Sequence, residues 1–338
     1  MSDATVSGLT GTWTENRVGA TTRPASTTTW RLPDARRCLQ LALAATWLLD
    51  GVLQMQPYMF SRAFGRLMLA STASGNPSVV AHSIAWAGRE IGAHADAANA
   101  LFCIIQIAIG LGIAGRPTLR AALGFSIVWS LSVWWFGEGL GALLTGTASP
   151  LMGAPGAVVL YALLAVLLWP SERHRSETFV AARVVGARAA RVVWMILWVG
   201  LGLLGLQAAN RAPDALSEMI TRMASGEPRW LAVLDARMAG ELMGRGLGVS
   251  ILLAVIMTLV GVGIFAPSRW AKSATVICAG FLAIAIWVVG EAFGGIFSGS
   301  GTDPNSGPLL VLIALAYWPL SQSLSARDQA QAASAEGD

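Results

Sequence analysis

The chain has 338 residues, of which 54% are hydrophobic and 12% are charged, and its net charge is +4. Soluble domains usually carry about 25% charged residues, so this composition excludes an ordinary soluble domain. The basic residues lie between apolar runs and form no face interleaved with aromatic side chains, which argues against nucleic-acid binding. The sequence therefore predicts an all-α protein that crosses a membrane several times.

Taken in chain order, the first element is a Thr-, Ser- and Gly-rich segment, and we predict that residues 1–37 form a disordered cytoplasmic N-terminus. Apolar runs follow, most of them long enough to cross a hydrocarbon core of about 30 Å. The tail at 321–338 is rich in Ala, Ser and Gln, and we expect it to be disordered and cytoplasmic as well. The eight predicted spans are at about 39–57, 97–114, 121–141, 155–170, 192–209, 247–265, 273–294 and 308–320.

Basic residues mark one side of the predicted bundle. Arginines precede the first span, separate the second from the third and fill a linker at 171–191, and Arg269 and Lys272 separate the sixth span from the seventh. The connections at 142–154 and 295–307 hold no basic residue. By the positive-inside rule, both termini and the basic connections face the cytoplasm. We therefore expect a multi-pass protein of the inner (plasma) membrane, with the lipid bilayer as its constant partner.

Two segments of mixed charge interrupt the apolar pattern. Residues 58–95 and 210–246 combine charged and apolar residues, and each contains a turn, at Gly75-Asn-Pro77 and at Gly226-Glu-Pro228. This composition is typical of amphipathic helices. We expect both segments to lie on the outer membrane surface or to cap the bundle.

A motif of the form W-x-x-G-E-x-x-G-x-x-x-[S/T]-G occurs twice, from Trp134 to Gly146 and from Trp287 to Gly299. Because each copy belongs to four spans, an even number, both copies have the same orientation. The sequence thus predicts eight transmembrane helices as two parallel four-helix repeats with outer amphipathic segments, at residues 38–170 and 192–320.

Polar residues gather in the first repeat. Asp50 and Gln54 lie in the first span, Asn99 opens the second, and Gln106 lies near the middle of that span. At 1.5 Å per residue, Asp50 lies about 20 Å across the membrane core from the cytoplasmic side. A carboxylate there costs about 2.5–3.5 kcal/mol on insertion scales, so it should face the bundle and have a partner. An outward-facing ligand pocket and a purely structural hydrogen-bond network both satisfy this requirement.

The repeated motif puts its tryptophan, glutamate, second glycine and hydroxyl residue on one helical stripe. A carboxylate beside such small residues could bind a cation, accept a proton or orient a polar head group. Alternatively, each glutamate lies at the outer interface, hydrated or bonded to a loop amide, and helps to pack the repeats. The stripe residues are Trp134, Glu138, Gly141 and Thr145 in the first copy and Trp287, Glu291, Gly294 and Ser298 in the second.

Other chemistry-bearing residues are few. His82 and His94 lie in the first mixed-charge segment, where Glu90 and His94 could share a helix face and bind a metal ion, although surface contacts are the commoner role of such histidines. The three cysteines lie in or beside spans without a CxxC pattern, which argues against a disulfide or a thiolate metal site. The chain contains no phosphate-binding, dinucleotide-binding, HExxH or GxSxG motif.

The run from Gly110 to Gly124, GLGIAGRPTLRAALG, leads from the second span to the third through a short basic connection. It resembles the DoxX/DoxD-like membrane family, and the run from Gly261 to Lys272 matches more loosely. The resemblance covers the layout of both halves and implies four-helix units, here duplicated in tandem where the family has a single unit. It also implies a role in quinone-linked sulfur oxidation or in membrane redox-stress complexes, with a quinone as candidate cofactor, but it carries over no catalytic residue.

Three functions follow from these observations. The first is the binding of a small or lipid-soluble partner in an outer-leaflet pocket, by an accessory subunit of a membrane redox assembly. The second is transport of a small solute or ion along the interface of the two repeats. The third is a purely structural membrane scaffold. The residues expected to line the pocket are Asp50, Gln54, Asn99, Gln106, Trp134, Glu138, Trp287 and Glu291.

Overall fold

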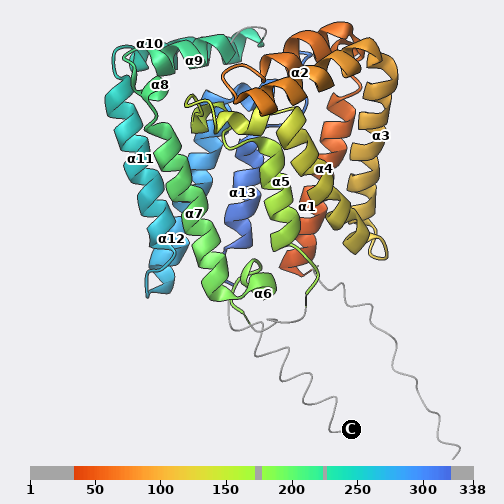
Figure 1. Cartoon of the computed structure of the whole chain (residues 1–338). Coiled ribbons are helices and arrows are strands. Elements are labelled where there is room, and N and C mark those ends of the chain that lie inside the picture. Colours follow the sequence, from red (N-terminus) through yellow and green to blue (C-terminus); the bar gives the residue numbers. More distant parts are fainter. Residues whose placement is uncertain (1–33, 172–176, 224–226, 321–338) are drawn as a thin grey trace, which may run out of the picture. The chain divides into compact units, whose positions relative to one another are not determined.

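The computed structural model describes residues 34–171, 177–223 and 227–320. Within these ranges every regular element is a helix (Figure 1), which confirms the predicted all-α class. The predicted disordered ends fall almost wholly outside the described residues. Helix α1 begins at Ala35, inside the last three residues of the predicted N-terminal segment 1–37.

The first half of the chain consists of five α-helices and several short 3-10 and π helices. The α-helices are α1 (Ala35–Leu53), α2 (Ser78–Ala93), α3 (Ala95–Ala114), α4 (Leu119–Phe136) and α5 (Ala157–Leu167). The short helices are η1 (Pro57–Phe60), η2 (Phe64–Leu69), η3 (Gly139–Ala142) and η4 (Pro150–Met152).

The second half follows a similar order. Its α-helices are α6 (Ala182–Val185), α7 (Ala187–Gly205), α8 (Ala208–Arg211), α9 (Ala215–Met223), α10 (Arg229–Leu242), α11 (Gly246–Gly263), α12 (Arg269–Ala285) and α13 (Ser306–Ala316). The short helices η5 (Ile286–Gly290) and η6 (Ala292–Gly295) follow α12.

The same helix pairings occur in both halves. Helix α1 packs along α3 as α7 packs along α11, and α4 packs along α5 as α12 packs along α13. Helices α5 and α13 contact each other, and most of their residues are buried, including Tyr161 and Ile313. The hydrophobic core therefore follows α5 and α13, which the longer helices surround (Figure 1).

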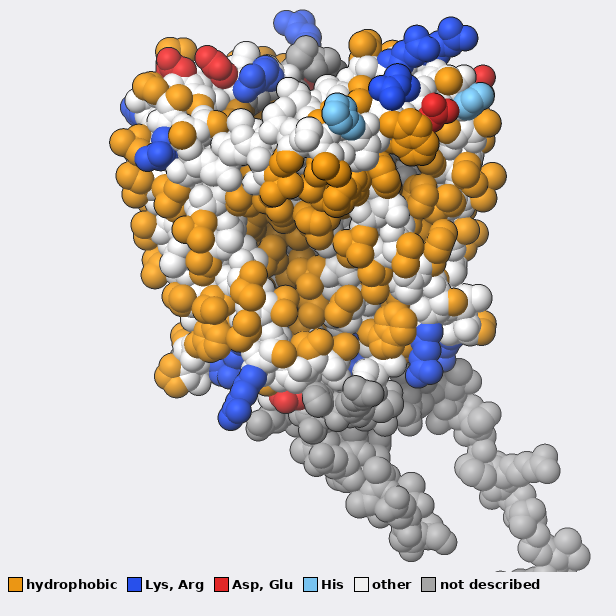
Figure 2. All heavy atoms as spheres, viewed as in Figure 1, with side chains coloured by type: hydrophobic (Ala, Val, Ile, Leu, Met, Phe, Trp, Pro, Cys, Tyr) orange, Lys and Arg blue, Asp and Glu red, His pale blue; other side chains and the backbone are white. Residues whose placement is uncertain are grey.

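Several helices present apolar side chains outward. Among the described residues, five helices are long and apolar enough to cross a membrane, namely α3, α4, α7, α11 and α12 with its continuation η5. Ile104, Leu203, Leu259 and Phe281 on four of them are 62% to 70% exposed. Figure 2 shows this hydrophobic surface between two rims that carry the charged side chains. Water-soluble monomers rarely expose such a wide apolar surface, so the fold is that of a multi-pass membrane protein.

Helices α2, α9 and α10 lie across one end of the bundle, called the upper end here after its place in Figure 1. They are formed by the two mixed-charge segments. Apolar side chains of this layer remain exposed, among them Trp86 and Trp230, as expected for helices that rest at a membrane interface. The opposite, lower end holds α6 and the basic connection between α3 and α4 (Figure 1).

The segment 178–182 closes the lower end between the two halves. Phe179 stacks on Tyr317 with ring centroids 5.4 Å apart, and the Tyr317 hydroxyl donates a hydrogen bond of 2.6 Å to the carbonyl of Ala190. The amide of Ala181 donates to the carbonyl of Ala316 at 3.0 Å. Part of the predicted linker is therefore packed into the core.

The repeated motif does not continue its helix, and the predicted helical stripe through both copies is wrong. Helix α4 ends at Phe136, and η5 ends at Gly290. Left-handed backbone follows at Gly141 (φ 60°) and Gly294 (φ 73°), which a right-handed helix cannot contain. Residues 137–156 and 291–305 form turns and 3-10 helices instead.

Helices α5 and α13 are shortened by these turns. Each has 11 residues, or about 16 Å of helix, so the regular helix alone covers about half of a core of about 30 Å. Irregular backbone is tolerated at membrane depth only where it is buried in protein or lines a cavity. The two irregular segments are therefore expected to be buried in protein or to line a cavity.

Candidate ligand-binding pocket

A cavity of about 860 Å³ lies between the first-half helices, the upper layer and the two irregular segments. Its volume falls in the range of about 300–1,000 Å³ that small-molecule sites occupy. The wall is mainly apolar and contains Trp47, Phe64, Met68, Trp86, Phe102, Trp129, Phe136 and Met152. The polar lining residues include Asp50, Gln54, Gln106, Glu138, Asp303 and Asn305.

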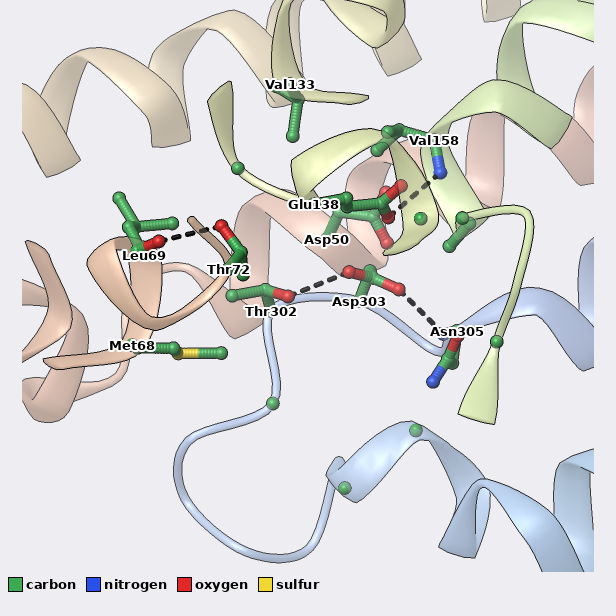
Figure 3. A pocket seen from close by; sticks show the side chains of 18 of the residues that line it. Asp50, Met68, Leu69, Thr72, Val133, Glu138, Val158, Thr302, Asp303 and Asn305 are labelled. Atoms are coloured by element: carbon green, nitrogen blue, oxygen red, sulfur yellow. Dashed lines mark hydrogen bonds between the residues drawn. The ribbon is translucent and has the colours of Figure 1, made fainter. Parts of the chain in front are cut away.

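Three carboxyl groups converge on this cavity. Figure 3 shows Asp50, Glu138 and Asp303 in the lining of the cavity. The three are near enough for Asp303 to repel negative charge on Asp50 and on Glu138. Asp50 is only 2% exposed, and its Oδ1 atom has no hydrogen-bond partner among the described residues. Such an atom needs a partner, because a buried polar group without one costs free energy.

One carboxyl oxygen of Glu138 accepts a hydrogen bond, and the other has no partner. The Trp134 indole donates a hydrogen bond of 2.7 Å to the carbonyl of Pro155, which ties the end of α4 to the start of α5. The amide of Val158 donates to Glu138 Oε1 at 3.2 Å, so the carboxyl group satisfies one of the free amides at the α5 N-terminus. Glu138 Oε2 is buried without a partner.

Glu291 occupies the equivalent place in the second half and is fully bonded. The Trp287 indole donates to the carbonyl of Pro304 at 2.8 Å. The Gly307 amide donates to Glu291 Oε2 at 3.0 Å, and the Ser306 hydroxyl donates to Glu291 Oε1. Glu291 is 0% exposed and does not line the cavity. Its role in the structure is therefore to cap α13, as the alternative reading of the motif allowed.

Gln54 and Asn99 bond to each other rather than to Asp50. The Gln54 side-chain amide donates to Asn99 Oδ1 at 2.6 Å, and Asn99 Nδ2 donates to the Gln54 carbonyl at 2.7 Å. Both side chains are buried. This pair joins the end of α1 to α3 and supplies the structural network that the sequence allowed, while Asp50 lies outside it.

Gln106 lines the cavity from α3. Its Oε1 atom is buried without a partner among the described residues. Phe102, one turn away, contacts Trp129 of α4 with ring centroids 5.6 Å apart. The α3–α4 wall thus combines one unpaired amide oxygen with an aromatic pair.

Asp303 is an acidic lining residue that the sequence analysis missed. Thr302 Oγ1 donates to Asp303 Oδ2 at 2.8 Å, and the Asn305 amide donates to Asp303 Oδ1 at 2.7 Å. Burial raises the pKa of the Asp303 carboxyl above its usual value, and these two hydrogen bonds offset part of the increase. Only its position before Pro304 in a connection without basic residues could have drawn attention to it.

The eight predicted pocket residues separate into two sets of four. Asp50, Gln54, Gln106 and Glu138 line the cavity. Asn99, Trp134, Trp287 and Glu291 do not line it and instead hold the surrounding segments through the hydrogen bonds described above.

The two candidate histidines lie on the upper surface. His82 is on α2 and His94 follows it, and both are exposed. The backbone at His94 has left the helix (φ −123°, ψ 42°), so the helix face proposed for Glu90 and His94 does not extend to it. In the described parts of the chain, no group of three His, Cys, Asp or Glu residues is arranged to hold a metal ion.

Comparisons with known proteins show no match to a protein-family model, to a curated protein or to a solved structure. The cavity and its carboxyl groups are therefore the basis on which a function can be inferred.

Proposed function

We propose that the protein binds a small lipid-soluble molecule in the cavity. One observation carries the proposal: a mainly apolar wall with several aromatic side chains surrounds two carboxyl groups, Asp50 and Glu138, that each retain an unpaired buried oxygen. Ligand sites of this kind combine apolar lining with a few placed polar groups. An occupant that bonds these oxygens would remove the cost of leaving them unpaired.

The proposed membrane arrangement is eight spans in two parallel tandem repeats, with both termini in the cytoplasm and the upper end outside. The recurring helix pairings support the duplication, as do the identical indole bonds of Trp134 and Trp287. The positive-inside rule supports the orientation, because the lower connections carry Arg116, Arg269 and Lys272. In this arrangement the cavity lies in the outer half of the membrane.

The occupant would enter sideways from the bilayer between α3 and α4. These helices approach closely near their lower ends, where a Cβ at Gly112 would lie 2.7 Å from the Ala122 side chain. Toward the upper end, Phe102 of α3 and Ser132 and Phe136 of α4 line the cavity. Phe136 is also partly exposed, which supports an opening of the cavity at this wall.

We further propose that the protein acts as an accessory subunit of a quinone-linked membrane redox assembly. This part of the proposal depends on the DoxX/DoxD-like run from Gly110 to Gly124. A quinone and its reduced quinol form share an apolar ring and tail, for which the aromatic side chains of the wall are suitable. A transport role receives no comparable support, since fully buried side chains such as Leu164, Tyr317 and Ile313 fill the space along α5 and α13 toward the lower end.

Two tryptophan substitutions on α4 test the pocket. Ser132→Trp would fill the mouth of the cavity, whereas Val128→Trp, one turn away, would place the same side chain at a 61% exposed position outside the lining. After extraction in mild detergent, native mass spectrometry of the wild-type protein and of Val128→Trp should show a co-purified lipophilic molecule. Pull-downs from the same extracts should retain a redox partner, as expected for a subunit of a redox assembly. Ser132→Trp should lose the molecule. Equal occupancy in all three proteins, or none in any, would contradict the proposal.

A further inference from the structure

We infer that the occupant presents hydrogen-bond donors, from a protonated amine or from hydroxyl groups, to Asp50 and Glu138. The inference depends on the proposed function and adds the chemistry of the bound head group. It also assigns different roles to the two copies of the glutamate motif, with Glu138 bonding the ligand and Glu291 capping a helix.

The unpaired atoms around the cavity are mainly acceptors. Asp50 Oδ1, Glu138 Oε2 and Gln106 Oε1 are buried without partners among the described residues. A carboxyl group offers several acceptor sites and donates at most one hydrogen bond, from its protonated form. The unpaired donors are fewer: Trp129 Nε1 lies in the same lining, and the hydroxyl of Tyr161 lies near Asp50. A head group that only accepts hydrogen bonds would leave the two carboxylates unsatisfied.

The charge of the lining also favours a donor or a cation. Its acidic residues are Asp50, Glu90, Glu138, Glu227 and Asp303, whereas Arg222 is the sole basic residue among the described lining residues. An anionic head group would be repelled at this site, because like charges repel each other strongly where water is excluded. The aromatic rings of Trp47 and Trp129 line the same cavity and can accept a cation over their faces.

The difference between the two glutamates has a sequence cause. Ser306 begins α13 and its hydroxyl bonds Glu291, while Ala157 begins α5 at the equivalent position and has no hydroxyl group. The residue before it differs too, since Asn305 caps α13 through its side chain, whereas Gly156 leaves space at this point. A Cβ at Gly156 would collide with Glu138 Oε2. The first half thus keeps one glutamate oxygen free and the space beside it open.

The binding experiment uses the full-length protein in lipid nanodiscs. The probe is radiolabelled n-dodecylamine at pH 7, with partitioning into empty nanodiscs subtracted. Asp50→Asn and Glu138→Gln should each weaken binding about tenfold or more, which corresponds to about 1.4 kcal/mol per tenfold change. Glu291→Gln is the matched control: its binding should stay within about twofold while its thermal stability falls, because it loses a hydrogen bond to the α13 N-terminus.

Ala157→Ser provides a test that removes no polar group. The hydroxyl gives Glu138 the partner that Ser306 gives Glu291, so the inference predicts weaker probe binding with unchanged or higher thermal stability. Gln106→Met, which introduces the residue found at the corresponding position 257, should weaken binding as well. These two variants keep the test informative even where Asp50→Asn impairs folding. Unchanged binding in both would overturn the inference.

Competing probes identify the source of the donors. If only unlabelled n-dodecylamine displaces the labelled probe, the ligand is an amine. If decylubiquinol also displaces the probe but decylubiquinone does not, the ligand presents hydroxyl groups. Either result supports the inference. Equal competition by donor-free n-dodecyltrimethylammonium or by decylubiquinone would overturn it. The proposed pocket would remain supported if Ser132→Trp still prevents binding of the probe. If Ser132→Trp binds the probe as the wild-type protein does, the proposed pocket is contradicted as well.

Discussion

At the scale of single residues, partners rather than residue types decide what a buried carboxyl group does. Glu138 and Glu291 share one motif and cap equivalent helices. Glu291 has partners for both oxygens, and Glu138 has a partner for only one. A single hydroxyl group, present in Ser306 and absent in Ala157, accounts for much of the difference.

Asp303 gives a prediction about pH. Because burial raises its pKa, the folded protein binds this proton more tightly than the unfolded chain does. Stability should therefore be greatest below the ordinary Asp pKa of about 3.9 and should decrease as the pH rises through the higher pKa of the folded state. Asp303→Asn removes this penalty and can keep both hydrogen bonds, since its Oδ1 accepts and its Nδ2 donates.

The expected result is a higher thermal midpoint for Asp303→Asn at pH 7 to 8, by about 2–4 °C for a gain of about 1 kcal/mol. At pH 4 or below the two proteins should unfold at nearly the same temperature, because Asp303 then carries its proton in both states. Thermal unfolding in detergent across this pH range measures the difference. A gain of equal size at every pH would show that the charge of Asp303 is not the cause.

At the scale of elements, the shape of the site follows from where two helices stop. The motif glycines adopt positive φ, and even non-glycine residues such as Leu140 and Phe293 do so. Such strained backbone tends to occur at functional sites. The turns shorten α5 and α13, and their irregular backbone supplies part of the cavity wall.

Glycine substitutions test this packing. At Gly307, at the start of α13, an added Cβ would collide with the side chain of Trp287, so Gly307→Ala should lower the free energy of unfolding by about 1–3 kcal/mol. At Gly248 of α11 an added Cβ meets nothing within 4 Å, so Gly248→Ala should raise stability by about 0.5–1 kcal/mol. Thermal unfolding of both variants measures the contrast. Equal effects would show that the close contact between α13 and Trp287 does not constrain the fold.

At the scale of the whole molecule, an apolar surface lies between two charged rims (Figure 2). The lower rim carries basic residues such as Arg188 and Arg191, and the upper layer mixes arginines with acids such as Asp214 and Glu218. This asymmetry is the basis of the proposed orientation.

Cysteine labelling tests that orientation. The native cysteines would first be replaced, after which Ser74→Cys reports on the upper end and Arg116→Cys on the lower end, both at exposed positions. A membrane-impermeant maleimide added to intact cells should label Ser74→Cys and should label Arg116→Cys only after permeabilisation. The reverse pattern would invert the protein in the membrane and place the cavity in the inner half.

The sequence by itself determined the helical class, the apolar runs, the amphipathic upper layer and the polar character of the first half. These are local properties, because backbone groups in lipid must bond within their own helix and hydrophobicity is read residue by residue. The tertiary structure decided where the motif helices end, which predicted residues share a cavity and that Asp303 joins them from the other half. These depend on contacts between segments far apart in the chain: the bond from Ser306 to Glu291, and the approach of Asp303 to Asp50, are set by packing and not by any local pattern.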